Sequence, residues 1–223
     1  GERKMKKLLG TMAMLLLTGC AAGPIKVNVS DITQSESVQL SDVRPSNESE
    51  KETFSLLITS DAYAIYRNGD AVTQPSPLRL LQHRAYEKLS SNGDPLNIEV
   101  FHFVSYMNAQ STLRTGAVGS IFGPIGAGIA TASKDQTSNF SYSDIDRNKF
   151  ESIPADQEYV RAYYSESENP NDAMVFVIYI DAEINGKRRI VRSVAPSVND
   201  NGDHPYTAAL EKSISAFLEY FGT

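Results

Sequence analysis

The chain has 223 residues, with 21 lysines and arginines, 27 aspartates and glutamates, 41% hydrophobic residues, one cysteine and no tryptophan. This balance fits a single globular domain and excludes full-length disorder, because the apolar content is high and the net charge of -6 is small. The single cysteine excludes a disulfide scaffold, and the lack of a basic surplus argues against nucleic-acid binding through phosphate contacts.

The first twenty residues have the pattern of an export signal. Lys6 and Lys7 form a basic start, and the run over 8–20 carries no charge. Such a run is too short to span a bilayer and is typical of a signal peptide. Met5 is the expected initiator, because Met-Lys-Lys is a compact charged start and the four residues before it add an ill-fitting acid.

The apolar run ends in Leu17-Thr18-Gly19-Cys20, which resembles the lipobox of bacterial lipoprotein precursors. Small residues before the cysteine let the chain enter a peptidase site, and a thiol is a suitable nucleophile for a diacylglyceryl group. The resemblance implies removal of residues 1–19 and a lipid on Cys20, which then anchors the protein permanently in a membrane. The alternative is an ordinary buried cysteine in a core helix.

The residues after the cysteine indicate which membrane is occupied. In enterobacterial lipoproteins an aspartate there favours the inner membrane, whereas this chain has Ala21 and Ala22, so the resemblance implies the outer membrane with the body facing the periplasm. The mature chain has 17 basic and 26 acidic side chains, which disfavours a diffuse attraction to anionic lipid or nucleic acid. With Cys20 lipidated, no thiol is left for a redox or thiolate metal site, and we expect no cofactor.

Residues 20–51 are rich in Ser, Asp, Glu and Asn, so we expect the lipidated N-terminus, a linker and one or two edge strands there. Within this region we predict an exposed loop over 45–50. Residues 54–58 form a predicted strand. Asn68-Gly69 predicts a turn that closes a hairpin with 62–66, and a helix over 61–67 is the alternative.

Ser76-Pro77 predicts the start of a helix over 76–91, with serine as N-cap and proline at the first helical position. Apolar residues then recur at spacings of three and four, which predicts one buried helical face. In the next element, 96–106, apolar side chains occur on both faces of the alternating pattern, which predicts a central strand. One face would carry Leu96, Ile98, Val100, Val104 and Tyr106, and the other Phe101 and Phe103.

The C-terminal half contains a predicted hairpin and a last helix. Residues 133–158 are polar and loop-like, and a strand is predicted over 158–164. Strands over 173–184 and 187–194 should pair through the favoured hairpin turn Asn185-Gly186. Pro205 opens a helix whose predicted buried face carries Tyr206, Leu210, Ile214, Phe217, Leu218 and Phe221.

This order predicts an α+β fold, with a mostly antiparallel sheet, two helices packed on one face and a glycine-rich apolar insertion at 115–133. The periplasmic domain is expected over 52–223. The order also resembles that of small periplasmic lipoproteins of the YajG type, from the lipobox through the helix at 76–91 to the final hairpin and helix.

The insertion has 19 residues without charge between Arg114 and Lys134. Gly119 with Gly123, and Gly126 with Ala130, are small residues at a spacing of four, which lets helices approach closely in lipid, and Gly116 is a further small residue of the segment. Membrane contact and an oligomer interface are therefore hypotheses for this segment. A mobile apolar loop, or two short strands around Gly123-Pro124, explains the same composition.

The sequence shows no pattern typical of catalysis. His83, His102 and His204 are expected on a helix surface, in a central strand and beside a helix start, away from any recognisable nucleophile. Asp200-Asn201-Gly202-Asp203 departs from the spacing of a calcium loop, so we expect no metal. Arg188 and Arg192 should share one face of their strand, which we expect to be solvated, the alternatives being an acidic partner or lipid head groups.

The sequence therefore favours a non-enzymatic outer-membrane lipoprotein that acts as an accessory or assembly factor through contacts with an envelope protein. One alternative is a membrane-active oligomer that inserts residues 116–132. Another is a carrier that binds a small apolar ligand between sheet and helices.

Overall fold

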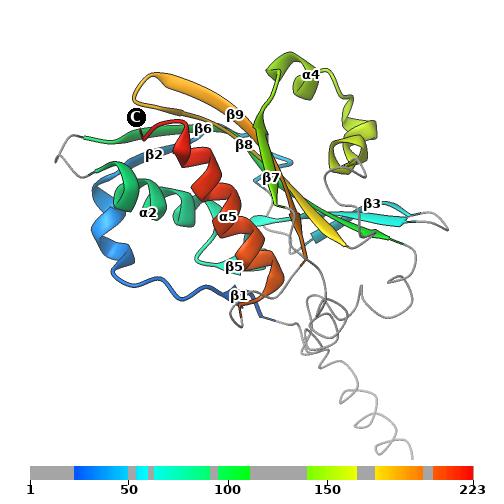
Figure 1. Cartoon of the computed structure of the whole chain (residues 1–223), viewed down its shortest axis with the longest axis horizontal. Coiled ribbons are helices and arrows are strands. Elements are labelled where there is room, and N and C mark those ends of the chain that lie inside the picture. The colour runs from blue at the N-terminus through cyan, green and yellow to red at the C-terminus, as the bar shows by residue number, and fades with distance from the viewer. Residues whose placement is uncertain are drawn as a thin grey trace, which may run out of the picture.

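A computed structural model describes residues 23–49, 54–59, 63–90, 95–110, 140–164, 174–197 and 203–222. The chain forms an α+β fold around a mostly antiparallel seven-stranded sheet, which confirms the predicted fold class (Figure 1). Cys20 and the glycine-rich insertion, with Gly116, Gly119, Gly123, Gly126 and Ala130, lie outside the described residues.

The sheet has the order β3-β4-β6-β8-β9-β7, and β2 adds to the same sheet by pairing parallel with β6. The remaining pairs are antiparallel. Its strands are β2 (Gln39–Asp42), β3 (Phe54–Thr59), β4 (Tyr63–Asn68), β6 (Asn97–Gln110), β7 (Ser141–Asp144), β8 (Val175–Ile184) and β9 (Lys187–Pro196). Two short strands, β1 (Ile25–Lys26) and β5 (Thr73–Gln74), form a separate parallel pair.

Two helices, α2 (Pro77–Leu89) and α5 (Pro205–Glu219), cover one face of the sheet, as predicted (Figure 1). Ser76 caps α2 by accepting a hydrogen bond from the Arg79 backbone, and His204 caps α5 in the same way. The main core lies between these helices and the sheet, and its large side chains include Leu80, Leu81, Phe176, Ile178, Tyr206 and Phe217. Among the described helices, none has the length and apolar character needed to cross a bilayer.

The opposite face of the sheet carries a second, smaller layer that the sequence did not predict. It consists of α4 (Arg147–Glu151) and the 3-10 helix η5 (Ala155–Ala162), so the loop expected over 133–158 and the strand expected over 158–164 are wrong where the chain is described. Phe150, Glu158 and Ala162 are buried against the sheet. Helices of one or two turns are too short to show a hydrophobic periodicity in the sequence. This is why α4 and η5 were not predicted.

A bulge in β6 determines which side chains face this second layer. The pairing of β6 with β8 shifts between Val100 and His102, so Phe103 faces the helices with Val100, while Val104 and Tyr106 face α4 and η5. The strand is central, as predicted, but the predicted distribution of its side chains is wrong beyond the bulge. An extra residue reverses the alternation, and this places His102 on the second-layer face.

One prediction in the N-terminal third is also wrong, and another holds only in part. β4 ends at Asn68 and pairs with β3, which precedes it, so the connection of this hairpin falls before Tyr63 and the helix over 61–67 is excluded. The predicted loop is exposed at 45–47, but Glu48 is an exception at 6% exposure, next to the buried Arg44. The other short helices are η2 (Ile32–Ser37) and η3 (Asp70–Val72).

Candidate functional site

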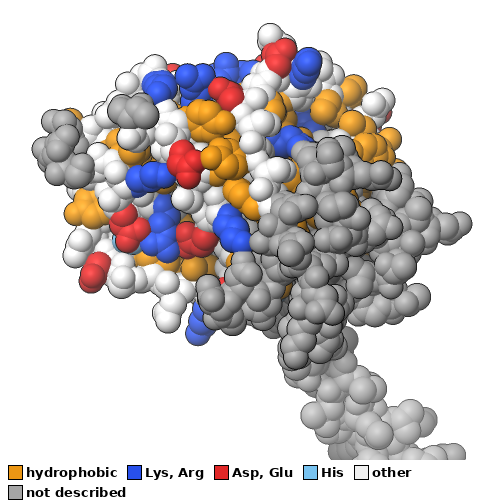
Figure 2. Space-filling model, viewed as in Figure 1, with side chains coloured by type: hydrophobic (Ala, Val, Ile, Leu, Met, Phe, Trp, Pro, Cys, Tyr) orange, Lys and Arg blue, Asp and Glu red, His pale blue; other side chains and the backbone are white. Residues whose placement is uncertain are grey.

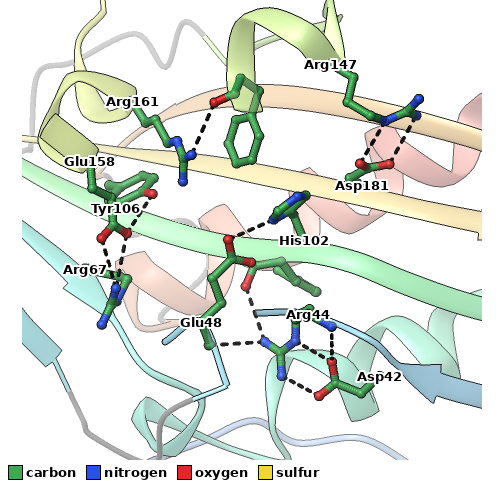
Figure 3. A network of polar contacts seen from close by, with 12 residues as sticks. Asp42, Arg44, Glu48, Arg67, His102, Tyr106, Arg147, Glu158, Arg161 and Asp181 are labelled. Atoms are coloured by element: carbon green, nitrogen blue, oxygen red, sulfur yellow. Dashed lines mark hydrogen bonds and ion pairs between the residues drawn. The ribbon is translucent and has the colours of Figure 1, made fainter. Parts of the chain in front are cut away.

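A group of charged and polar side chains lies between the sheet and the second layer. We call this group the buried polar layer. Figure 3 shows how its members from the loop after β2 and from β4, β6, β8, α4 and η5 face one another, and Arg188 joins them from β9. Its members are Glu48, Arg67, His102, Tyr106, Arg147, Glu158, Asp181 and Arg188.

Asp181 on β8 is fully buried and is held by two arginines. Arg188 donates from Nε and Nη2 at 2.9 and 2.7 Å, and Arg147 donates from Nε and Nη2 at 3.1 and 3.4 Å. The Arg188 guanidinium also lies over the Phe101 ring, 3.4 Å from its centroid. Hydrogen bonds from two guanidiniums compensate the cost of burying this carboxylate.

His102 and Glu48 form the second pair of the layer. Nδ1 of His102 lies 2.8 Å from Oε1 of Glu48, whose side chain is 2% exposed. Oε2 of Glu48 is buried and has no hydrogen-bond partner in the described part of the chain. Phe150 of α4 packs edge-on against the imidazole, with 4.9 Å between ring centroids. His102 is therefore fixed in position from two sides.

Glu158 on η5 joins the layer to β4 and β6. Arg67 donates to both of its carboxylate oxygens, at 3.2 and 3.0 Å, and the Tyr106 hydroxyl donates to Oε1 at 3.0 Å. Burial, and next the negative charge of Glu158, raise the pKa of Tyr106 well above its ordinary value. Tyr106 thus stays neutral and donates a hydrogen bond to Glu158, so its role is structural and it does not act as an acid.

Arg44 forms a neighbouring pair of contacts with Asp42 and Asp70, with shortest distances of 2.8 and 2.7 Å. Burial by itself would lower the pKa of Arg44, but the hydrogen bonds to both carboxylates outweigh it and raise that pKa. The same hydrogen bond holds the pKa of Asp42 below its ordinary value, against a smaller opposing effect of burial. This side of the layer is a structural clamp on the segment that carries Glu48.

A ring nitrogen of His102 and one carboxylate oxygen each of Glu151 and Asp181 lie within 4.8 Å of one another. The sequence predicts no metal, because its acidic turn over 200–203 departs from the spacing of a calcium loop and no zinc spacing appears. His102, Glu151 and Asp181 are far apart along the chain. Strand pairing opposes His102 to Asp181, and α4 brings Glu151 above them. The only signal in the sequence was a histidine in a central strand.

The other residues singled out in the sequence have structural roles. His83 is buried rather than on the helix surface, and its Nδ1 lies 3.2 Å from the Ser35 hydroxyl. Arg188 and Arg192 do share a face, and it is only half-exposed, because Arg188 binds Asp181 and Arg192 donates to the Tyr163 carbonyl at 2.7 Å. Residues 200–202 of the acidic turn lie outside the described residues.

Two open grooves lie on the described surface. One, of about 590 Å³, follows the ends of β2, β6 and β8 and is lined by Gln39, Ser41, Asn97, Glu99, Glu183 and Asn185 among others. The other, of about 320 Å³, lies between α2 and α5 and is lined mainly by charged side chains. Figure 2 shows acidic and basic side chains interspersed on that face. Apolar ligands prefer enclosed apolar pockets, so neither groove favours a carrier of such a ligand.

Comparison with family models, with curated proteins and with solved structures gives no match to this chain. The inferred function therefore depends on the residues themselves.

Proposed function

We propose that this chain is an outer-membrane lipoprotein, anchored through Cys20, whose periplasmic domain is a non-enzymatic accessory or assembly factor. The observation that carries this proposal is the motif Leu17-Thr18-Gly19-Cys20 at the end of an uncharged apolar run. Small residues followed by a thiol are what signal removal and lipid transfer require, and Ala21 and Ala22 favour the outer membrane by resemblance.

The buried polar layer supports a role without catalysis. Its acids and bases contact one another across strands and helices, as in Asp181 with Arg188 and Glu158 with Arg67. Groups matched in this way stabilise a particular packing, whereas a catalytic acid or nucleophile must reach a substrate.

Exposed apolar side chains support action through protein contacts. Leu56 is 53% exposed on β3, and Tyr142 is 42% exposed on β7. These strands end the main path of the sheet, and within the described chain each pairs on one side only. Edge strands with exposed apolar side chains are suited to pairing with another protein.

The anchor is tested by Cys20→Ser, with Thr18→Ser as a matched control that keeps the motif. We expect Cys20→Ser to lose the acyl groups and to appear in the soluble periplasmic fraction, while the control stays in the outer membrane. Mass spectrometry of the mature protein should find a modified Cys20 as its first residue. An intact start at Met5, or an unmodified sulfur, would overturn the proposal.

The contact role is tested by crosslinking in intact envelopes with Leu56→Glu and Tyr142→Glu. We expect at least one substitution to remove a crosslinked envelope partner, while the exposed control Lys149→Glu on α4 keeps it. If all three variants retain every crosslink of the parent, the edges of the sheet are not the contact surface.

The uncharged segment 115–133 favours a second candidate, a membrane-active oligomer. As a straight helix it would reach about 28 Å, close to the thickness of the hydrocarbon core. Deletion of residues 116–132 separates the two candidates. The leading proposal expects a folded protein with an unchanged oligomeric state, and the second expects the loss of a detergent-stable oligomer.

A further inference from the structure

We propose that His102, Glu151 and Asp181 form a zinc site, which goes beyond the proposed function and does not depend on it. One ligand atom from each residue lies within 4.8 Å of the others. Ligand atoms of a tetrahedral zinc ion lie about 3.3 to 3.6 Å apart, given bonds of about 2.0 to 2.2 Å. Zinc binding therefore requires small side-chain movements: Glu151 is exposed on α4 and can rotate, and the Asp181 carboxylate can shift once it gives up one arginine.

Glu48 orients the histidine for this role. Its Oε1 lies 2.8 Å from Nδ1 of His102, and its side chain is 2% exposed. A hydrogen bond from Nδ1–H to a carboxylate leaves Nε2 with a free lone pair, which is the arrangement that metal-bound histidines adopt. In the view of Figure 3, His102 lies between Glu48 and Asp181. Glu48 is therefore a positioning residue, which acts through its Oε1 atom.

The charge around His102 also favours a cation. Glu48, Glu151 and Asp181 supply three carboxylates, and two arginines, Arg147 and Arg188, bind Asp181. Arg44 reaches only the backbone carbonyl of Glu48. Beside a neutral imidazole, three carboxylates and two guanidiniums leave one negative charge. A divalent ion would compensate it at short range, where the low local dielectric makes the attraction strong.

Arg147 is the residue that competes with the metal. Within the described ranges, the Asp181 carboxylate accepts four hydrogen bonds, all from Arg147 and Arg188, so a metal must take an oxygen from one of these arginines. Arg147 makes the longer bonds, 3.1 and 3.4 Å, and is 33% exposed. Arg188 makes the shorter bonds and is also held over Phe101. We therefore expect Arg147 to turn toward solvent when zinc binds.

The ligand set favours zinc over calcium and magnesium. One imidazole and two carboxylates suit a four-coordinate zinc ion with water in the last position. Calcium and magnesium prefer oxygen ligands throughout, from carboxylates, carbonyls and water, so the imidazole in this set disfavours both of them.

The experiment is a calorimetric titration of zinc chloride into the full chain in mild detergent, with Cys20→Ser so that the thiol cannot bind the metal. We expect one ion per chain and no saturable heat with calcium chloride. His102→Gln and Glu151→Gln should each weaken zinc binding at least tenfold. Glu48→Gln should weaken it about 10- to 100-fold. The exposed control Glu36→Gln should leave it unchanged, and Arg147→Gln should strengthen it severalfold by removing the competitor.

A second measurement needs no variant beyond the parent. Nitrogen NMR of its three histidines should show zinc shifting the Nε2 resonance of the histidine whose Nδ1 keeps its proton. The site is overturned if the parent, folded by circular dichroism, binds no zinc. It is also overturned if folded His102→Gln and Glu151→Gln variants keep the parent's affinity. If Arg147→Gln weakens zinc binding, Arg147 does not compete with the metal for Asp181, and that part of the proposal is wrong.

Discussion

Arg84 on α2 and Glu211 on α5 face each other across the contact between the two helices, with both of their hydrogen bonds at 2.8 Å. The hydrogen bond to Glu211 is the main cause that raises the pKa of Arg84 above its ordinary value, and burial opposes it. Both side chains remain about 30% exposed, at 30% and 28%. The pair therefore aligns the helices at the surface, above a core that supplies most of the stability.

Glu211→Gln should lower the free energy of unfolding by about 0.5 to 1 kcal/mol, the upper range for an exposed ion pair with good geometry. The effect should shrink at high salt, because exposed charges are screened. Urea unfolding of Arg84→Gln, Glu211→Gln and the double variant at low and high salt checks this. A coupling energy that does not change with salt would show that the pair acts through packing instead.

Asp181→Asn should destabilise the fold by about 2 to 3 kcal/mol, because the half-buried Arg147 and Arg188 lose the counter-charge that they share at a fully buried position. The matched control is Asp144→Asn, since Asp144 binds Arg189 at 3.0 Å with both side chains well exposed. The control should cost under about 1 kcal/mol. Unfolding by urea in the presence of a chelator measures both, so that any bound metal is excluded. Equal losses in the two variants would contradict the burial argument.

The Asp42 and Arg44 pair predicts a loss of stability in acid. The folded pKa of Asp42 is lowered, chiefly by the hydrogen bond from Arg44, whereas the unfolded chain should titrate near the ordinary value of about 3.9. Between the folded and the unfolded pKa of Asp42, the unfolded state binds more protons than the folded state. The contribution of Asp42 to the free energy of unfolding is therefore complete above the unfolded pKa and is lost as the pH falls through the folded pKa. Asp42→Asn should be less stable at pH 6 and should lose less on acidification.

Urea midpoints measured from pH 6 to pH 2.5 test this expectation, with the exposed Asp203→Asn as control. The control should follow the parent curve. Convergence of the Asp42→Asn and parent curves toward low pH is the required result, and two parallel curves would remove Asp42 from the acid response.

A substitution in the turn between β8 and β9 should change stability through the backbone conformation alone, without a change in side-chain packing. Gly186 has φ +84°, and an added Cβ would meet nothing within 4 Å. Gly186→Ala should therefore destabilise by about 1 to 2 kcal/mol through the left-handed conformation alone. Gly23→Ala is the control, because its Cβ also meets nothing and its φ is not in that region. Thermal unfolding of both variants measures the difference.

Local signals in the sequence predicted the elements that local physics determines. Ser76 with Pro77 and the turn Asn185-Gly186 satisfy end groups or backbone angles within a few residues, and both lie where predicted. The last helix begins at Pro205, and its predicted apolar residues Tyr206, Leu210, Ile214 and Phe217 are buried in the main core.

The second layer and the candidate site depend on partners far along the chain. The bulge before His102 leaves no mark in the apolar pattern, and a one-residue shift reverses every later side chain. Glu48 stands among Ser, Asn and Glu, a composition typical of an exposed loop, yet Arg44 and His102 bury it. Polar residues that pair across a fold have the same local pattern as polar residues in water.

The pairing of β1 with β5 fixes the chain at Ile25, only five residues after Cys20. If Cys20 carries the proposed lipid, this connection can extend over about 17 Å at most. So short a tether would keep the β1 corner of the domain close to the bilayer, and partners more than a domain's width away would have to approach the membrane themselves.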